Sequence, residues 1–225
     1  MPVREALAFD MYGTLVDTSA IKEQLAAFFP EQAAQLAQTW RQHQLEFSFR
    51  VTLMGQYKDF ASVTRKALDY TLDASKLSLT PRQKDSLMAH YNALVPHADV
   101  KPGLERLQSA GFPMVIFSNG APSMLHDLLD HSGLRPYFQD IISADEIKVY
   151  KPTPKLYQHA AQRLNRPLSE TRLISANPFD VTGALNAGIR AALVNRSNLP
   201  LDPLGATPDV IVKTLTELAD ALTRA

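Results

Sequence analysis

The chain has 225 residues, of which 23 are Lys or Arg and 23 are Asp or Glu, so its formal net charge is +0. This length suits one large domain, or a core with a smaller insert, and the balanced charge argues against nucleic-acid binding, which needs a basic surface. The absence of cysteine excludes disulfide scaffolds, Cys-ligated zinc or iron–sulfur centres, and thiol catalysis.

The N-terminal segment carries Glu5 where a secretory signal would need an uninterrupted apolar run, so we expect no signal peptide. No apolar stretch approaches the roughly 18 residues that a membrane helix needs. We therefore expect a cytoplasmic protein with no membrane partner.

The first predicted strand, Ala6–Phe9, is followed by a long segment with a different pattern. From about residue 17 to residue 96 no convincing strand occurs, and apolar residues recur at helical spacing. The helices predicted in this segment are Ile21–Phe29, Glu31–Phe49, Phe60–Leu72 and Thr80–Leu94. An all-helical block inserted after the first strand indicates a cap domain.

After residue 96, strand and helix patterns alternate. The predicted strands are continuously apolar, which is typical of a parallel sheet covered on both faces: Met114–Phe117, Ile141–Ile142, Leu173–Ser175, Ala191–Val194 and Val210–Val212. The predicted helices are Gly103–Ala110, Ser123–His131, Thr153–Leu164, Phe179–Ala187 and Leu215–Leu222. The sequence thus predicts an α/β protein: a Rossmann-like, doubly wound parallel sheet from residues 1–15 and 97–225, with a helical cap domain from residues 16–96.

Polar side chains follow four of the predicted strands at the point where each strand ends. They are Asp10 and Thr14, then Ser118 and Asn119, then Lys151, and finally Ser175, Asn177 and Asp180. Each residue alone also has an ordinary structural interpretation. Asp10 can cap a turn or helix, the Ser118-Asn119 pair can form a turn, Lys151 can be a solvated surface residue, and Asp180 can start a helix. Because the carboxyl ends of parallel strands meet at one edge, where ligands bind in open sheets, the four together predict a single site.

The residue types at this edge suggest their chemistry. A carboxylate such as Asp10 can act as a nucleophile and form a covalent ester, and the Thr14 hydroxyl can hold it in place. The hydroxyl and amide of Ser118 and Asn119, with backbone donors ahead of a helix, suit an anion such as a carboxylate. The six histidines have no metal-ligand spacing, and the nine glycines form no nucleotide-binding loop.

The motifs, in this order, resemble the haloacid dehalogenase superfamily. The segments that carry the resemblance are Asp10-x-Tyr12-Gly-Thr14, Ser118-Asn119-Gly, Lys151-Pro and Ser175-x-Asn177-x-x-Asp180. More narrowly, the run from Trp40 to Glu46 is similar to the Trp-Arg-x-x-Gln-Leu-Glu helix of the type II L-2-haloacid dehalogenases, and Leu53-Met54 and Tyr57-x-x-Phe60 follow it as they do there. The resemblance spans essentially the whole chain.

This resemblance implies the hydrolysis of short-chain (S)-2-haloalkanoic acids to (R)-2-hydroxyalkanoic acids and halide. Asp10 would attack C2 and expel halide with inversion, and water activated by Asp180 would then cleave the ester. The catalytic residues that the resemblance implies are Asp10, Thr14, Arg41, Lys151, Ser175, Asn177 and Asp180. Among them, Lys151 would keep Asp10 ionised through its charge, and Arg41 would receive the halide.

The resemblance also implies how the substrate is bound. Its carboxylate would sit on Ser118, Asn119 and the backbone amides that follow Asp10, beside apolar walls that exclude water. The substrate-binding residues implied are Met11, Tyr12, Arg41, Gln42, Leu45, Phe60, Ser118, Asn119, Tyr157 and Phe179. The partners expected are therefore the haloacid and halide. Relatives are commonly homodimers, which by analogy makes a homodimer the assembly to test.

Two departures argue against the metal-dependent phosphatase branch of the superfamily. Tyr12 stands where phosphatases carry a second Asp that protonates a poor leaving group, whereas halide leaves without a proton. Ala176 stands where they carry a metal-binding Asp, which leaves only Asp180 for a magnesium site. We therefore expect no metal and no cofactor. A phosphatase, and a catalytically silent relative that uses its cap as a binding surface, remain the alternatives.

Overall fold

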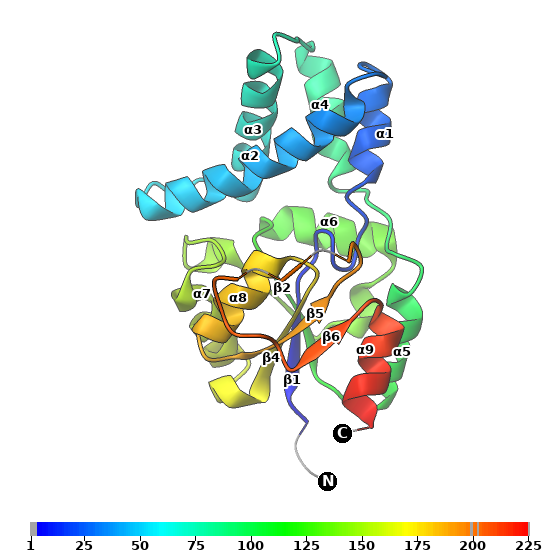
Figure 1. Ribbon diagram of the computed structural model, residues 1–225, viewed down its shortest axis with the longest axis vertical. Coiled ribbons are helices and arrows are strands. Elements are labelled where there is room, and N and C mark those ends of the chain that lie inside the picture. Colours follow the sequence, from blue (N-terminus) through cyan, green and yellow to red (C-terminus); the bar gives the residue numbers. More distant parts are fainter. Residues whose placement is uncertain (1–3, 199, 202, 225) are drawn as a thin grey trace.

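The computed structural model of the chain describes residues 4–198, 200–201 and 203–224. Figure 1 shows a group of helices standing above a core in which strands lie between further helices. No helix within those ranges combines the length and the apolar character that crossing a bilayer requires.

The core is built on a parallel sheet with the strand order β3-β2-β1-β4-β5-β6 among the described residues. The strands are β1 Ala6–Phe9, β2 Met114–Ser118, β3 Asp140–Ser143, β4 Thr171–Ser175, β5 Arg190–Val194 and β6 Val210–Val212. The strand order reverses at β1, which lies between β2 and β4. In sheets of this type the crevice at the carboxyl ends of the strands beside such a reversal is where ligands bind.

The strands are apolar on both faces because helices cover both faces of the sheet. Every residue of β1, β2 and β4 is buried, as their continuous apolar runs predict. The strands at the two edges are more exposed, for example at Asp140 in β3 and at Ile211 in β6. The predicted doubly wound parallel sheet is confirmed. β2 and β3 extend beyond their predicted bounds because backbone pairing continues through polar residues such as Ser118 and Ser143.

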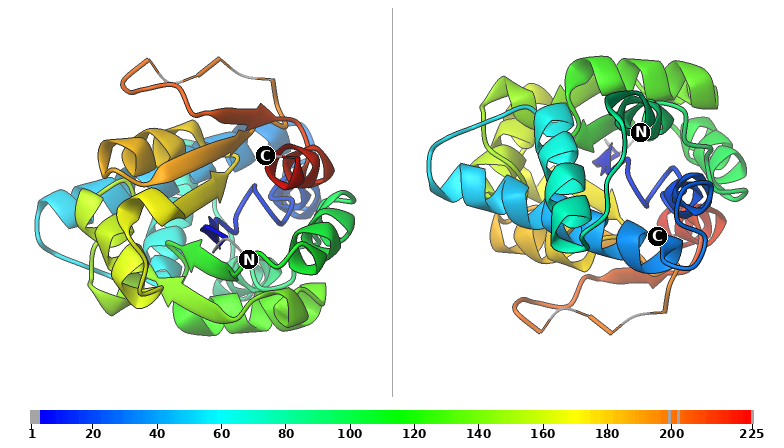
Figure 2. Two further views of the ribbon diagram at one scale, coloured as in Figure 1. Left: turned by 90° about the horizontal axis from the view of Figure 1, so that it is seen from below. Right: turned by 90° about the horizontal axis from the view of Figure 1, so that it is seen from above.

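Five helices cover the sheet. They are α5 Val100–Ser109, α6 Pro122–Ser132, α7 Pro154–Arg163, α8 Pro178–Asn186 and α9 Leu215–Thr223. Figure 2 shows α7 and α8 on one side of the sheet, with α5 and α9 side by side on the other. Short 3-10 turns at Arg135–Tyr137, Ala144–Glu146 and Leu168–Glu170 complete the connections.

The segment after β1 is helical, as predicted, and residues 20–90 contain no strand. Its helices are α1 Ala20–Ala26, α2 Ala33–Leu53, α3 Phe60–Ala74 and α4 Pro81–His90. Helices α2 and α3 pack against each other. The fully buried Trp40 of α2 donates its indole N–H to the backbone oxygen of Thr64 in α3 over 2.9 Å. This bond fixes how the two helices are aligned.

The inserted helices form where the sequence predicts them, but their first and last residues differ from the predicted ones. The helix predicted to reach Phe29 ends at Ala26, because Pro30 disfavours helical geometry in the residue before it. The next helix continues four residues beyond Phe49, to Leu53. The last helix is predicted over Thr80–Leu94 and spans Pro81–His90: Thr80 is its N-cap, whose hydroxyl accepts a backbone N–H in a capping box, and the helix ends four residues before Leu94.

The chain leaves the core and returns to it at one place. Val16, on the outgoing segment, forms a bridge with Pro96 on the returning one. Two backbone hydrogen bonds flank this bridge, from Asp17 N to Val95 O at 2.9 Å and from His97 N to Leu15 O at 3.1 Å. The inserted helices are thus joined to the core by two neighbouring backbone segments.

Candidate active site

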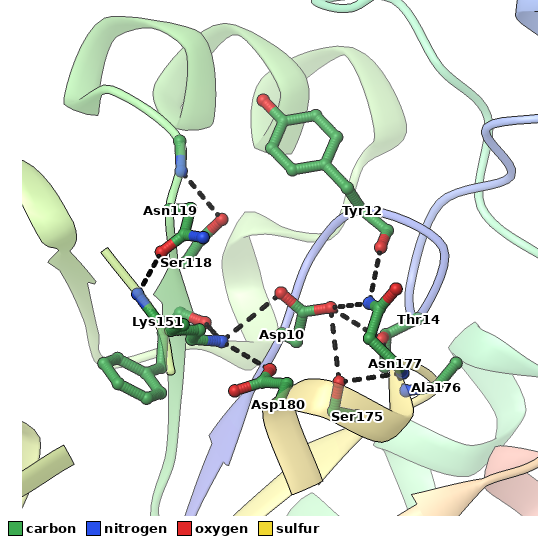
Figure 3. Close-up of polar contacts among 12 residues, drawn as sticks. Asp10, Tyr12, Thr14, Ser118, Asn119, Lys151, Ser175, Ala176, Asn177 and Asp180 are labelled. Atoms are coloured by element: carbon green, nitrogen blue, oxygen red, sulfur yellow. Dashed lines mark hydrogen bonds and ion pairs between the residues drawn. The ribbon is translucent and has the colours of Figure 1, made fainter. Parts of the chain in front are cut away.

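The carboxyl ends of three adjacent strands meet below the inserted helices. In the sheet register, Phe9 of β1 pairs with Ile116 of β2 and with Ile174 of β4. The residues that follow these positions therefore lie at the same level, and Asp10 comes to lie between the ends of β2 and β4. Figure 3 shows the polar contacts that result.

The carboxylate of Asp10, a residue that is 6% exposed, has two oxygens in different surroundings. Oδ2 accepts hydrogen bonds from Thr14 Oγ1 and from Asn177 Nδ2, both at 2.8 Å, and a longer one from Ser175 Oγ at 3.5 Å. Oδ1 accepts only a long bond from Lys151 Nζ at 3.4 Å among the described residues. One oxygen is therefore held by neutral donors, while the other has free lone pairs.

The donors to Asp10 are themselves fixed by the loops after β1 and β4. Gly13 has a φ of 82°, a left-handed conformation that glycine adopts readily, and it turns the chain so that Thr14 faces Asp10. The Thr14 hydroxyl also accepts the backbone N–H of Ala176 at 2.8 Å. Asn177 Nδ2 donates a second bond to the backbone oxygen of Tyr12 at 3.1 Å. These bonds tie the two loops together around the carboxylate.

Lys151 is 1% exposed, and its ammonium group has an acceptor for each of its three protons. The acceptors are Phe117 O at 2.7 Å, an oxygen of Asp180 at 2.8 Å and the more distant Asp10 Oδ1. The ammonium also lies 4.3 Å from the centre of the Phe117 ring. Its backbone N–H donates to Asn119 Oδ1 at 2.9 Å. A single buried cation therefore serves two buried carboxylates.

Asp180 lies in the first turn of α8 and is 1% exposed. Lys151 binds one of its oxygens, and the Tyr157 hydroxyl donates to the other at 2.8 Å. Burial raises the pKa of Asp180, since the charged form loses its hydration, and the negative charge of Asp10 acts in the same direction against the effect of Lys151. Burial also raises the pKa of Tyr157, so that this hydroxyl stays protonated and remains a donor.

The polar cluster opens onto a small cavity of about 10 Å³ between the core and the inserted helices. The residues that line it are Asp10, Tyr12, Arg41, Leu45, Phe60, Ser118, Asn119, Lys151, Asn177 and Phe179. Arg41 and Leu45 come from α2, and Phe60 begins α3. The inserted helices thus supply one cation and part of an apolar wall, opposite the carboxylates of the core.

Most residues singled out in the sequence come together at this cavity or directly behind it. Thr14, Ser175 and Asp180 lie behind the lining residues, where they contact Asp10 or Lys151. Three others lie apart from the cavity. Gln42 is exposed, Met11 is fully buried in the core, and Tyr157 contacts Asp180 instead of the cavity.

Two residues near Arg41 went unrecognised in the sequence. Arg41 Nη1 donates to Gln44 Oε1 at 2.6 Å, and Gln44 Nε2 donates to Thr64 Oγ1, also at 2.6 Å. The spacing of Gln44, three residues after Arg41 on one helix, is a signal that the sequence does contain. Thr64 lies on another helix, so its contact follows only from the packing of α2 on α3.

The residues present do not fit a magnesium ion. The described part of the chain has no group of three or more His, Cys, Asp or Glu side chains that could hold a metal. Ala176 brings no oxygen donor from its side chain, and the Lys151 ammonium already contacts an oxygen of both Asp10 and Asp180. The chemistry of this site is therefore derived from its side chains alone.

Comparison with known proteins shows the family to which this chain is similar. Residues 5–188 match the family described as haloacid dehalogenase-like hydrolase. The chain is 35% identical to (S)-2-haloacid dehalogenase 2 of Pseudomonas sp. (strain CBS-3) over 216 residues, which cover 96% of this chain and 94% of that protein. It is 38% identical to (S)-2-haloacid dehalogenase 1 of the same strain over 223 residues, with 99% and 98% covered.

A solved structure is similar to this chain over nearly its whole length. The L-2-haloacid dehalogenase of Xanthobacter autotrophicus, with chloropropionic acid covalently bound, superposes with a TM-score of 0.90. The two sequences are 33% identical, and 98% of each chain is covered. The likeness therefore includes both the sheet that carries Asp10 and the inserted helices above it.

Proposed function

Because this chain belongs to the haloacid dehalogenase-like hydrolase family, we propose that it hydrolyses short-chain (S)-2-haloalkanoic acids to (R)-2-hydroxyalkanoic acids and halide. The observation that carries the proposal is the Asp10 carboxylate, with one oxygen held by neutral donors and the other free beside a cavity that Arg41 also lines. A carboxylate so placed is oriented to act as a nucleophile towards a bound carbon atom.

In the first step Asp10 Oδ1 attacks C2 of the haloacid. A carbon–oxygen bond forms, the carbon–halogen bond breaks with inversion at C2, and the halide leaves with the bonding electron pair. Arg41 supplies positive charge to the departing halide, and no proton is needed. Lys151 balances the charge of the attacking carboxylate. The chloropropionic acid bound covalently in the Xanthobacter dehalogenase supports such an ester for this chain.

In the second step water attacks the carbonyl carbon of the Asp10 ester, and Asp180 takes its proton. Negative charge then develops on Oδ2, the oxygen that Thr14 and Asn177 contact at 2.8 Å. These donors are in place before the charge forms, so they act as an oxyanion hole, with Ser175 as a more distant third donor. The adduct then collapses and the Cγ–Oδ1 bond breaks, so that Oδ1 leaves on C2 as the product hydroxyl, takes the proton back from Asp180, and the Asp10 carboxylate is regenerated. The raised pKa of Asp180 makes it a stronger base than an ordinary aspartate.

The contacts of Ser118 and Asn119 support a binding site for the substrate carboxylate. The Ser118 hydroxyl accepts the backbone N–H of Gly120 at 3.1 Å, which leaves its own proton for a ligand. Asn119 Oδ1 accepts the backbone N–H of Lys151, so the side-chain NH₂ of Asn119 is turned the other way. Two donors beside one cavity favour a carboxylate, while Tyr12, Leu45, Phe60 and Phe179 enclose the alkyl group.

The division into domains is part of the proposal. We assign residues 1–15 and 97–225 to the core and residues 16–96 to a cap domain that closes the active site. The two neighbouring backbone segments that join the inserted helices to the core support these bounds. Separate folding cores would give the two parts distinct hydrogen-exchange rates, which is the measurement that tests the division.

A cytoplasmic location and a homodimer are also proposed. Fractionation of cells that express the protein tests the location. Large exposed apolar side chains on α2, its C-cap and α3, at Leu53, Met54 and Tyr70, support self-association. Light scattering of the purified protein decides between monomer and dimer.

One assay separates this function from its alternatives. We expect halide release from (S)-2-chloropropionate with or without EDTA, little release from the (R) enantiomer, and no hydrolysis of p-nitrophenyl phosphate. A phosphatase of the same superfamily would hydrolyse the phosphate ester and lose that activity with EDTA. A catalytically silent relative would process none of these compounds. Asp10→Asn, which removes the nucleophile, is the background control.

A further inference from the structure

A chain of hydrogen bonds runs from the cavity into the packing between α2 and α3. It begins at Arg41, passes through Gln44, which is 0% exposed, and ends at Thr64, which is also 0% exposed. We propose that Gln44 and Thr64 are positioning residues, which hold the Arg41 guanidinium where the halide departs. This inference rests on the proposed function.

Thr64 is one of two side chains that orient the Gln44 amide, because the Tyr91 hydroxyl also shares a hydrogen bond with Gln44. The single hydroxyl proton of Thr64 is donated to the backbone oxygen of Phe60 at 2.7 Å. Thr64 Oγ1 is therefore an acceptor towards Gln44, and only the NH₂ group of the amide can face it. The amide oxygen then points to Arg41, where it accepts a bond from the guanidinium. A reversed amide would place its NH₂ group against a cation.

The group that holds Arg41, the Gln44 amide, is neutral, so the positive charge of Arg41 stays available to the halide. None of the ion pairs formed within the described residues includes Arg41. A carboxylate at position 44 would hold the guanidinium equally well but would neutralise much of its field. An amide fixes the geometry of Arg41 and leaves its full charge for a leaving anion.

The same pair of helices contains a matched arrangement away from the cavity. The Thr71 hydroxyl, seven residues beyond Thr64 on α3, donates to Ala67 O at 2.7 Å and lies 2.9 Å from His43 Nδ1 on α2. Thr71 is 1% exposed and does not line the cavity. Replacing Thr71 by Val therefore removes the same kind of interhelical bond without affecting Arg41.

The test compares Thr64→Val with Thr71→Val in single-turnover experiments, with enzyme in excess over (S)-2-chloropropionate or (S)-2-bromopropionate. Halide release reports the first step, and hydroxy acid formation reports hydrolysis of the ester. We expect Thr64→Val to slow chloride release about tenfold, which corresponds to about 1.4 kcal/mol, because the variant removes the neutral hydrogen bond between Thr64 and the Gln44 amide that holds Arg41. Bromide is the better leaving group, so its release should slow less, and ester hydrolysis should keep its rate.

Thr71→Val should show wild-type rates for both halides, and Thr64→Ser, which keeps the hydroxyl, should restore chloride release. Gln44→Met repeats the test without the amide if Thr64→Val fails to fold. An unchanged bromide-to-chloride ratio in a folded Thr64→Val or Gln44→Met variant would overturn the inference, as would an equal loss in both steps. Failure of the wild-type enzyme to release halide would instead refute the proposed function.

Discussion

Lys151 donates to Asp180 across 2.8 Å, and both side chains are 1% exposed. A buried ion pair of this kind contributes little net stability over a well-packed apolar pair, but the loss of one partner leaves the other charged and without compensation. The loss of Lys151 would leave two carboxylates without compensation, because the same ammonium group also faces Asp10. The pair is thus a structural requirement of the site as well as a part of its chemistry.

Lys151→Met should therefore lower the free energy of unfolding by about 3–5 kcal/mol and abolish halide release. Urea titration at neutral pH measures the first effect, and single-turnover chloride release the second. Lys84→Met is the matched control, because Lys84 pairs with Asp69 at 2.6 Å near the surface and should cost at most about 1 kcal/mol. An equal decrease in the free energy of unfolding for the two variants would contradict the importance of the buried pair for stability.

The raised pKa of Asp180 sets an expectation for the pH profile. A protonated Asp180 cannot take a proton from water, so ester hydrolysis should fall as the pH drops through a pKa above the ordinary aspartate value of about 3.9. Tyr157 stabilises the carboxylate by donating to it. Tyr157→Phe should therefore raise that pKa further and move the acid limb up by about one pH unit.

Rapid quenching of product formation at a series of pH values, from about 4 to about 9, measures the acid limb of the rate of ester hydrolysis. Tyr137→Phe serves as the control, because the Tyr137 hydroxyl contacts Glu105 at the surface and should not affect the limb. An acid limb that stays in place or moves to lower pH in Tyr157→Phe would remove Asp180 from the role of base.

Arg41→Ala should slow halide release by about a hundredfold or more while leaving the fold intact, since it removes the cation towards which the halide departs. Arg41→Lys should rescue only part of the rate, because a compact ammonium group cannot reproduce the planar fork of donors. Single-turnover chloride release, with circular dichroism to confirm folding, measures both. An unimpaired Arg41→Ala variant would remove this residue from the mechanism.

The oxygen atoms report which group attacks C2. After a single turnover in H₂¹⁸O with enzyme in excess, mass spectrometry should find the label in the peptide that contains Asp10 and not in the hydroxy acid. The product receives Oδ1 of Asp10, and solvent oxygen replaces it. The peptide that contains Asp180 should stay unlabelled. Label found directly in the product would mean that water attacks C2 and that Asp10 is a general base.

The fold and the carboxylates of the site could be predicted from sequence because both depend on local pattern. Continuous apolar runs define β1, β2 and β4, and parallel pairing then brings the residues after them to one edge. The contacts of Thr64 and Tyr157 depend instead on how separate helices pack. No spacing along the chain indicates that Thr64 meets Gln44, or that Tyr157 meets Asp180.

Gln42, which the resemblance implies as a substrate-binding residue, does not share a helix face with Arg41. Successive residues of an α-helix are rotated by roughly 100°, so Gln42 points well away from Arg41, its neighbour in sequence. Gln44 and Leu45, three and four residues on, return to the face of Arg41. In the structure Gln42 is exposed, Gln44 is buried and Leu45 lines the cavity. Helix geometry therefore favours Gln44 over Gln42 as the residue that contacts Arg41.

The bridge between Val16 and Pro96 has a consequence for turnover. The cavity, at about 10 Å³, has room for about one water molecule and not for a haloacid. Admission of the substrate therefore requires the lining side chains or the inserted helices to move. Two neighbouring backbone segments connect these helices to the core, and two backbone hydrogen bonds hold them together. Such a pair can work as a hinge, so opening and closing can limit the rate even where the bond-breaking steps are fast.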